Sequence, residues 1–336
     1  MKRPTSLTLA AVMLATLAPA QPLQANDSMA GMALGGLQFI RSDDVALREQ
    51  FLHITHERIR VRYVFRNESA EPVDALIAFP LPALSGHEYD YVPIPYPDRA
   101  NYVGFRTWID GEEIEPNVES RALLLGIDVT ERLRALDVPL VAFDYNSVEA
   151  IRALPAETFA ALQEDLLIDR NGFPQWQLAT SLWRRQGFAP GVDVVVEHAY
   201  TPVRGGSVAS PIGNVPPSQS GEWIDQARAR YCIEPEMEAA MYLRQNVGDE
   251  YHYLTFAASE VEYLLTPGGN WRGPIGHFRL IVEAPHPEDY VFMCEDRARR
   301  VAPNRIEIDE VDFYPWRDLD ILIPHLVGEG IERDGW

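Results

Sequence analysis

The feature that most constrains the fold is an alternation of apolar and charged side chains in residues 57–66. Ile59, Val61, Tyr63 and Phe65 lie on one side of the pattern, and Arg58, Arg60, Arg62 and Arg66 lie on the other. Successive side chains of a strand point to opposite faces, so this spacing predicts a strand with one buried face. Such strands must close over a hydrophobic core, and an apolar content of 46% is sufficient to form one.

Two hairpins are predicted in the first half of the chain. Turn-forming residues follow the first strand, and we interpret residues 73–79 as the strand that returns beside it. Residues 105–109 and 112–114 form the second predicted hairpin. They are joined by Asp110 and Gly111, a pair that favours tight two-residue turns.

The middle of the chain has a helical pattern. Ser147 is a candidate N-cap, Pro155 can begin a second helix, and residues 176–186 form a third candidate that ends at Gly187. Strand patterns return from Val192, with one short helix expected before Cys232 and another after it. The later strand candidates are residues 251–265, 277–284, 289–294, 299–308 and 319–323.

The predicted fold class is mainly β, antiparallel and β-sandwich-like, with a helical insertion in the middle, and therefore α+β overall. Four regions are expected along the chain. They are a signal peptide at 1–25, an N-terminal β-sandwich-like region at 26–145, a helical segment at 146–190, and a C-terminal β-rich region with a disulfide at 191–336.

Residues 1–25 have the pattern of a secretory signal peptide. Lys2 and Arg3 form a basic start, and residues 7–17 form an apolar run that is too short to cross a bilayer. Small residues offer cleavage points after Ala20 and after Ala25, and we favour the second. The alternative is an uncleaved anchor. The protein is expected to be periplasmic or secreted, with no membrane span after cleavage.

The chain is acidic and has a single lysine. Residues 1–25 carry Lys2, Arg3 and no acidic residue, so their removal changes the net charge from −21 to −23. Without Lys2 the positive charge is all arginine, which excludes Schiff-base and P-loop lysine chemistry. Nucleic acid is an unfavourable partner for so acidic a chain. A salty habitat and a GC-rich genome explain this composition equally well.

Cys232 and Cys294 are the only cysteines. In an oxidising compartment such a pair usually forms a bridge, and two free buried thiols are the alternative. A loop of this length would give the bridge about 4 kcal/mol of stabilisation in the chain-entropy treatment.

Two segments are candidate contacts for a ligand or partner. Residues 85–102 combine several prolines with aromatic side chains, among them Tyr91 and Tyr96, which could stack on a ligand. Residues 268–276 are glycine-rich and contain Asn270 and Trp271, which could bind a sugar or peptide. The structural alternatives are a loop folded over the sheet and a turn whose tryptophan fills the core.

The sequence contains no recognisable catalytic motif. It has no Gly-x-Ser-x-Gly elbow, no His-Glu-x-x-His pair and no Cys-x-x-Cys. His53 and His56 do not have the spacing of ligands on one strand face, and His198 is interpreted as a packed or surface histidine. Carboxylates in residues 307–320 could bind calcium, but a solvated edge fits their spacing better. No catalytic, cofactor or metal residue is assigned.

The chain resembles the bacterial exported family called domain of unknown function 4424. The matching residues include Asn26-Asp27-Ser28, Phe79-Pro80-Leu81-Pro82, His198-x-Tyr200-x-Pro202, Tyr231-Cys232 and Asn270-Trp271-x-Gly273-Pro274-Ile275-Gly276. The resemblance implies that the two cysteines pair and that the protein is exported, and it implies no activity. Residues 65–111 are also faintly similar to the vault protein inter-alpha-trypsin domain, a β-sandwich module.

We therefore expect a non-catalytic binding or interaction protein of the cell envelope. Its partner would be an unknown envelope protein or a small ligand, and no cofactor is expected. The alternative is a secreted hydrolase that acts on glycans through carboxylates that the sequence cannot pair. An enzyme should gather perturbed carboxylates in one concave pocket, whereas a binding protein need not.

Overall fold

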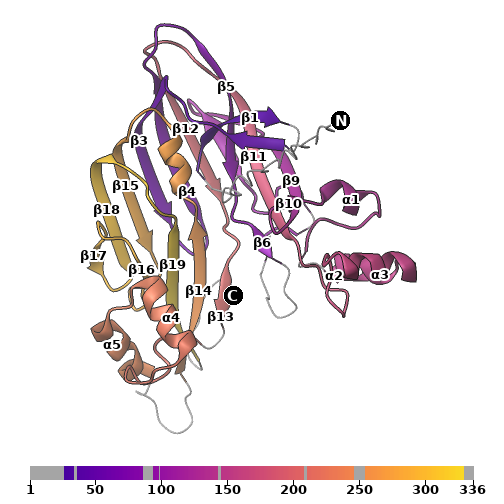
Figure 1. Cartoon of the computed structure of the whole chain (residues 1–336). Coiled ribbons are helices and arrows are strands. Elements are labelled where there is room, and N and C mark those ends of the chain that lie inside the picture. Colours follow the sequence, from indigo (N-terminus) through magenta and orange to yellow (C-terminus); the bar gives the residue numbers. More distant parts are fainter. Residues whose placement is uncertain are drawn as a thin grey trace, which may run out of the picture.

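The computed structural model describes residues 26–328, apart from 34–35, 86–93, 98, 143–144, 208–209 and 246–253. Three sheets form most of the molecule, and two groups of helices lie at its periphery (Figure 1). Within these ranges no helix is both long and apolar enough to cross a membrane. The expected signal peptide lies outside the described residues.

The first sheet has seven strands, all paired antiparallel. Six follow the order β10-β9-β11-β5-β1-β2, and β6 pairs with the start of β11. The strands are β1 (Ser28–Ala33), β2 (Gly36–Phe39), β5 (Val73–Pro80), β6 (Leu84–Ser85), β9 (Asn117–Leu124), β10 (Ile127–Asp128) and β11 (Gln177–Phe188).

The second sheet has eight strands in the order β17-β18-β15-β3-β4-β12-β7-β8. They are β3 (Val45–Ile54), β4 (Ile59–Asn67), β7 (Arg106–Ile109), β8 (Glu112–Ile114), β12 (Asp193–Tyr200), β15 (Ile275–Glu283), β17 (Arg299–Ala302) and β18 (Arg305–Phe313). Strand β15 pairs in parallel with β3, so this sheet contains strands from both β-rich regions of the sequence.

The third sheet has four strands in the order β13-β14-β19-β16. They are β13 (Gly205–Ser207), β14 (Leu254–Tyr263), β16 (Phe292–Met293) and β19 (Leu319–Gly328), and a 3₁₀ turn, η1 (Thr266–Asn270), follows β14. Helices α4 (Glu222–Tyr231) and α5 (Pro235–Gln245) pack on this sheet. Helices α1 (Thr130–Arg134), α2 (Tyr145–Arg152) and α3 (Ala156–Glu164) lie beside the first sheet, at the far side of the molecule (Figure 1).

One hydrophobic core joins the three sheets. Phe79 of the first sheet lies with its ring centre 6.4 Å from that of Tyr263 in the third, and both are buried. Phe65 of the second sheet packs against Trp271, with 4.5 Å between ring centres. Each large side chain buried in this way contributes about 1.5–3 kcal/mol, so the sheets stabilise one another at this junction.

The mainly β, α+β fold class is confirmed, as is the hairpin of β7 and β8. Its turn residues Asp110 and Gly111 have φ of 50° and 85°, the left-handed conformation that this tight turn requires. The first predicted hairpin is wrong. Strand β4 pairs with β3 and β12, while β5 pairs with β11 and β1 in a different sheet.

Asn67 explains why the chain leaves the second sheet after β4. Its side-chain amide donates to the carbonyl oxygens of Glu71 (2.8 Å) and Phe188 (2.9 Å) and is buried. Glu71 belongs to the connection to β5, and Phe188 is the last residue of β11. The side chain therefore fixes a corner between two sheets, not a hairpin turn.

The helix predicted at residues 176–186 is also wrong, because residues 177–188 form strand β11. Residues 178–182 are all buried, since β11 lies inside the first sheet between β9 and β5. A strand covered on both faces loses its period-two pattern, and a short apolar run then fits a helix equally well.

Cys232 and Cys294 form a disulfide, as predicted. Cys232 ends α4 in a left-handed conformation with φ of 49°, and Cys294 directly follows β16. The bridge therefore ties the end of α4 to the outer strand of the third sheet.

Candidate functional site

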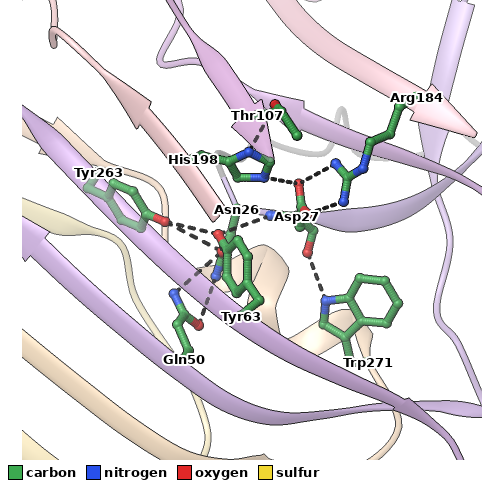
Figure 2. Close-up of polar contacts among 9 residues, drawn as sticks. All are labelled: Asn26, Asp27, Gln50, Tyr63, Thr107, Arg184, His198, Tyr263 and Trp271. Atoms are coloured by element: carbon green, nitrogen blue, oxygen red, sulfur yellow. Dashed lines mark hydrogen bonds and ion pairs between the residues drawn. The ribbon is translucent and has the colours of Figure 1, made fainter. Parts of the chain in front are cut away.

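A cluster of buried polar side chains lies where the three sheets meet (Figure 2). At its centre the carboxylate of Asp27, just before β1, accepts hydrogen bonds from Arg184 of β11 and His198 of β12. The Arg184 Nη2–Asp27 Oδ2 distance is 2.7 Å, and the His198 Nε2–Asp27 Oδ1 distance is 3.1 Å. All three side chains are buried. We call this set, with the residues below that bond to it, the Asp27 cluster.

The charges of the Asp27 cluster are balanced internally. Burial alone would raise the pKa of Asp27, but the charge of Arg184 and the hydrogen bonds from Arg184 and His198 outweigh it and hold that pKa well below its usual range. Burial lowers the pKa of His198, and Asp27 only partly opposes this effect. The neutral ring then donates from Nε2 to Asp27.

Thr107 completes an arrangement that resembles a catalytic triad. With Nε2 protonated, Nδ1 of His198 accepts a hydrogen bond from the Thr107 hydroxyl over 3.1 Å. A triad must expose its nucleophile to a substrate. Here the side chains of His198 and Asp27 are 0% exposed and Thr107 is 1% exposed. This geometry holds strands together and offers no route to a substrate.

The other half of the cluster surrounds Asn26. Its Oδ1 accepts from the hydroxyl of Tyr63, and its Nδ2 lies 3.4 Å from Oε1 of Gln50 and 3.3 Å from the carbonyl oxygen of Leu265. The Tyr263 hydroxyl lies 3.4 Å from the same Oδ1. Residues 26 and 27 thus contact side chains from all three sheets, as Figure 2 shows.

Asn270 and Trp271 face this cluster. The Trp271 indole Nε1 donates to the carbonyl oxygen of Asp27 over 2.8 Å, and its ring is 1% exposed. Asn270 Nδ2 donates to Ser28 Oγ over 2.9 Å. Their polar groups therefore serve internal contacts, which fits the structural alternative for residues 268–276.

Of the two tyrosines singled out in residues 85–102, Tyr91 lies outside the described residues. Tyr96 is 40% exposed and packs over Gly104, where an added Cβ would lie 2.5 Å from the tyrosine ring. Gly104 has φ of 62°, so both its backbone and this contact require glycine. Tyr102, from the same loop, is buried and lines a cavity.

That cavity has a volume of about 480 Å³, and the ring of Phe105 contacts both Tyr200 in its wall and His198 of the Asp27 cluster. We call it the Tyr200 cavity. Its walls come from the segment that joins β5 to β6, from the chain between β12 and β13, and from β14 and α4. The lining residues are 81–85, Tyr102, Val103, Tyr200, Pro202, Val203, Gly205, Gly206, Arg230, Glu260 and Glu262.

Tyr200 links the cavity to the core. Its ring packs 5.5 Å from Phe105 and 5.7 Å from Phe79, measured between ring centres. Burial, with the nearby phenols of Tyr263 and Tyr102, raises its pKa well above the usual value, so the hydroxyl stays protonated. Among the described residues this hydroxyl has no hydrogen-bond partner. An unmade bond of a buried group costs about 1–3 kcal/mol.

Charged side chains lie at the edge of the cavity. Arg230 Nη2 donates to Glu262 Oε1 over 2.7 Å and to Asp320 Oδ1 over 2.6 Å. Glu260 lies 3.9 Å from Arg230 Nη1 and accepts from the Tyr231 hydroxyl over 3.0 Å. Of these residues the sequence singled out only Asp320, as a possible calcium ligand, since only the fold brings β14, β19 and α4 together.

Several predicted metal candidates have other partners. Asp309 pairs with His277, Asp318 accepts from the backbone N–H groups of Leu265 and Thr266, and His53 bonds to Glu283. No group of three or more potential metal ligands occurs within the described part of the chain.

Asp27, His198 and Tyr200 all belong to the motifs that carry the family resemblance. Their place in these motifs was the signal by which the sequence could have pointed to this region. The sequence did not show that residues so far apart in the chain lie together in the fold. His198 is packed, which is one of the two alternatives that the sequence left open, and its partner Asp27 lies at the start of the described residues.

No curated protein matches the chain. A candidate nutrient-binding protein from Legionella pneumophila is 11% identical over 90% of this chain and 70% of its own, with a TM-score of 0.40. An M1 zinc metallopeptidase from Deinococcus radiodurans is 11% identical over 84% of this chain, with a TM-score of 0.26. The chain spans 43% of that enzyme. Neither likeness supports a transfer of function.

The family comparison is clear. A family model described as "Domain of unknown function (DUF4424)" matches residues 25–322, which include the Asp27 cluster, the Tyr200 cavity and both cysteines. The chain therefore belongs to the DUF4424 family.

Proposed function

We propose that this protein is an exported, non-catalytic binding protein that holds a small ligand in the Tyr200 cavity. One observation carries the proposal: a cavity of about 480 Å³ has a buried tyrosine hydroxyl without a partner in its wall. Small-molecule sites are typically concave and mostly apolar, with a few polar groups and volumes of roughly 300–1,000 Å³. The volume of this cavity falls in that range, and apolar and aromatic side chains line it together with polar and charged ones.

Binding fits the ionisable groups better than catalysis does. Among the described residues, the carboxyl groups whose pKa is clearly displaced are Asp27, Glu113 and Asp225, and none of them lines the cavity. Asp27 is sealed in the core, whereas Glu113 and Asp225 lie at the surface in ion pairs with arginines. An active site would be expected to gather such groups in one pocket.

The hydrolase alternative rests on Glu260 and Glu262, which share one face of β14 and line the cavity. A glycosidase needs one carboxyl group protonated and the other charged. Arg230 pairs with both carboxylates, so each of them already has a cationic partner. Release of reducing sugar from envelope glycans, abolished by Glu260→Gln, would favour the hydrolase instead.

Export is part of the same proposal. The disulfide and the expected signal peptide both favour the periplasm or the extracellular medium. Cell fractionation with mass spectrometry of the intact protein tests it. A protein recovered outside the cytoplasm that begins at Asn26 would support cleavage after Ala25. A cytoplasmic protein that retains residues 1–25 would contradict export.

The binding proposal is tested on protein purified after export of the full chain. Thermal shifts with a library of small metabolites should reveal stabilising ligands, and calorimetry then measures their affinity. Tyr200→Phe should weaken binding, whereas Tyr314→Phe, an identical change at an exposed tyrosine outside the cavity, should not. If no small molecule stabilises the protein, or if both variants bind equally, the proposed site is wrong. The similarity to the vault module remains a prediction.

A further inference from the structure

The edge of the Tyr200 cavity has an excess of negative charge. Glu260 and Glu262 line it, and Asp320 shares the same guanidinium, Arg230. Three carboxylates against one arginine leave a formal charge of −2. Arg230 is the only cationic residue among the lining residues, so an anionic ligand would face repulsion that this single arginine does not offset.

Of these carboxylates, Glu260 has the greatest capacity for a new partner. Glu262 and Asp320 each bond to Arg230 at 2.7 Å or less, whereas Glu260 is 3.9 Å from it. Only Oε2 of Glu260 accepts a hydrogen bond, from Tyr231, within the described structure. Its side chain is 41% exposed, so its other oxygen can accept from a ligand at the mouth of the cavity.

The walls behind this edge are apolar and aromatic. Leu81, Leu84 and Val103 line them together with the phenol rings of Tyr102 and Tyr200. The Tyr200 hydroxyl is buried there and makes no hydrogen bond within the described residues. The cavity thus combines an acidic edge, an apolar middle and a polar atom in its buried wall.

A bare metal ion does not fit this arrangement. The described residues contain no cluster of three metal-binding side chains, and a divalent ion beside Arg230 would be repelled by it. An organic cation needs only one or two carboxylates, and its apolar part can fill the middle of the cavity. The acidic chain as a whole also attracts cations over longer distances.

We propose that the Tyr200 cavity binds a small organic cation, an amine or guanidinium compound with an apolar or aromatic body. Glu260 accepts hydrogen bonds from the cationic group, and the Tyr200 hydroxyl bonds to a polar atom at the opposite end. This inference rests on the proposed function, because it names the ligand class of the same site.

Three probes of similar shape test which ligand charge the cavity prefers. Tyramine, tyrosol and 4-hydroxyphenylacetate share a phenol ring and differ in an ammonium, a hydroxyl or a carboxylate group. Agmatine, tryptamine and spermidine extend the amine set. We expect calorimetry to give at least tenfold tighter binding for the best amine than for a neutral probe, and no binding of the carboxylate. Rising salt concentration should weaken amine binding severalfold.

Two variants test the two proposed ligand contacts, Glu260 and Tyr200, independently of each other. Glu260→Gln keeps an acceptor for Tyr231 and should weaken amine binding about tenfold, while leaving tyrosol binding unchanged. Tyr200→Phe should weaken both. Glu157→Gln, a matched change on α3 and outside the cavity, should alter neither.

The outcomes distinguish this inference from the proposed function. If neutral or anionic molecules bind through Tyr200 as tightly as the amines, the cavity is a ligand site but the cation assignment is wrong. Amine binding that survives Glu260→Gln also overturns the assignment. If no probe or library compound binds, both the inference and the proposed function fail.

Discussion

The Asp27 cluster and the Tyr200 cavity are neighbours built from similar side chains. They differ in whether their tyrosine hydroxyl groups have hydrogen-bond partners and in whether their charges are balanced. In the Asp27 cluster the hydroxyl groups of Tyr63 and Tyr263 bond to Asn26, and Arg184 neutralises Asp27. In the cavity the Tyr200 hydroxyl has no partner among described residues, and carboxylates outnumber the arginine. The cluster is closed and balanced, and the cavity is open and unbalanced.

This difference suggests that the cluster stabilises the fold, whereas the cavity is the region proposed to bind a ligand. A buried Thr–His–Asp arrangement looks catalytic by residue type, but its complete burial makes it a joint between sheets. The Tyr200 hydroxyl, which makes no hydrogen bond within the described residues, is less conspicuous, but we propose that a ligand bonds to it. Exposure and hydrogen-bond partners therefore identify the candidate site here, and residue types alone do not.

The largest effect is expected when the cluster loses its charge balance. Asp27→Asn leaves Arg184 buried without a counter-ion, and removing one partner of a buried pair typically costs about 3–5 kcal/mol. Urea unfolding should register this loss, or the variant should fail to fold. Glu113→Gln removes an exposed ion pair with Arg106 and serves as the control, with little change expected. Equal stability of Asp27→Asn and the wild type would mean that the cluster does not hold the sheets.

Reduction of the disulfide should follow in size. The Cys232–Cys294 bridge closes a loop of 62 residues and is expected to stabilise the protein by up to about 4 kcal/mol. Thermal unfolding with and without reductant measures the effect. The Asp27 cluster does not involve the bridge, so the loss should add to that of Asp27→Asn. An unchanged melting temperature after verified reduction would contradict a structural role.

Acidification should weaken the cluster in two steps. The pKa of His198 is lowered in the folded protein, so below about pH 6.5 the unfolded chain binds a proton that the folded chain does not. The pKa of Asp27 is also lowered, and its contribution declines as the pH falls below about 4. Both steps reduce stability towards acid.

The His198 step is measured as a difference between proteins, because the whole acidic chain also responds to pH. Between pH 8 and pH 5 the melting temperature of the wild type should fall relative to that of His198→Gln. A wild-type protein that gains stability relative to the variant over this range would show that His198 is protonated in the core.

The smallest and most selective effect comes from one substitution made in both regions. Tyr63→Phe removes a hydroxyl that bonds to Asn26 and should cost about 1–3 kcal/mol, since it leaves a buried acceptor short of a partner. Tyr200→Phe removes a hydroxyl without a partner and should be neutral or stabilising by up to about 1 kcal/mol. Denaturant melts of both variants measure the contrast. Equal losses would remove the distinction between cluster and cavity.

Local patterns in the sequence predicted the fold wherever neighbouring residues decide the structure. Residues 57–66, the turn at Asp110-Gly111 and strands β14 and β15 follow from spacing and turn chemistry. The single strand expected at 299–308 is wrong, because this range holds the end of one strand, β17, and the start of the next, β18. The disulfide followed from the number of cysteines and the expected compartment. Local patterns could not predict which sheet β5 joins. The chain turns away from the second sheet at Asn67, whose side chain bonds to Phe188, 121 positions away in the sequence.

The candidate site could be predicted even less. Tyr200 was visible only as part of a family motif, and His198 was interpreted only as a packed or surface histidine. Their surroundings come from β5, β14 and the segment at residues 26–28. Glu260 and Arg230 belong to elements with ordinary charge patterns, and only the third sheet brings them to one cavity. Trp271 had the composition of a ligand contact, yet its hydrogen bond to Asp27 lies inside the protein.

The most direct test of the account is a crystal structure of the protein with the tightest amine found by calorimetry. We predict the ligand in the Tyr200 cavity, its cationic group on Glu260 and a polar atom within hydrogen-bonding distance of the Tyr200 hydroxyl, with the Asp27 cluster unchanged. A ligand bound to His198 and Asp27 after the cluster has opened, or bound at another surface, would contradict the division between a closed joint and an open site.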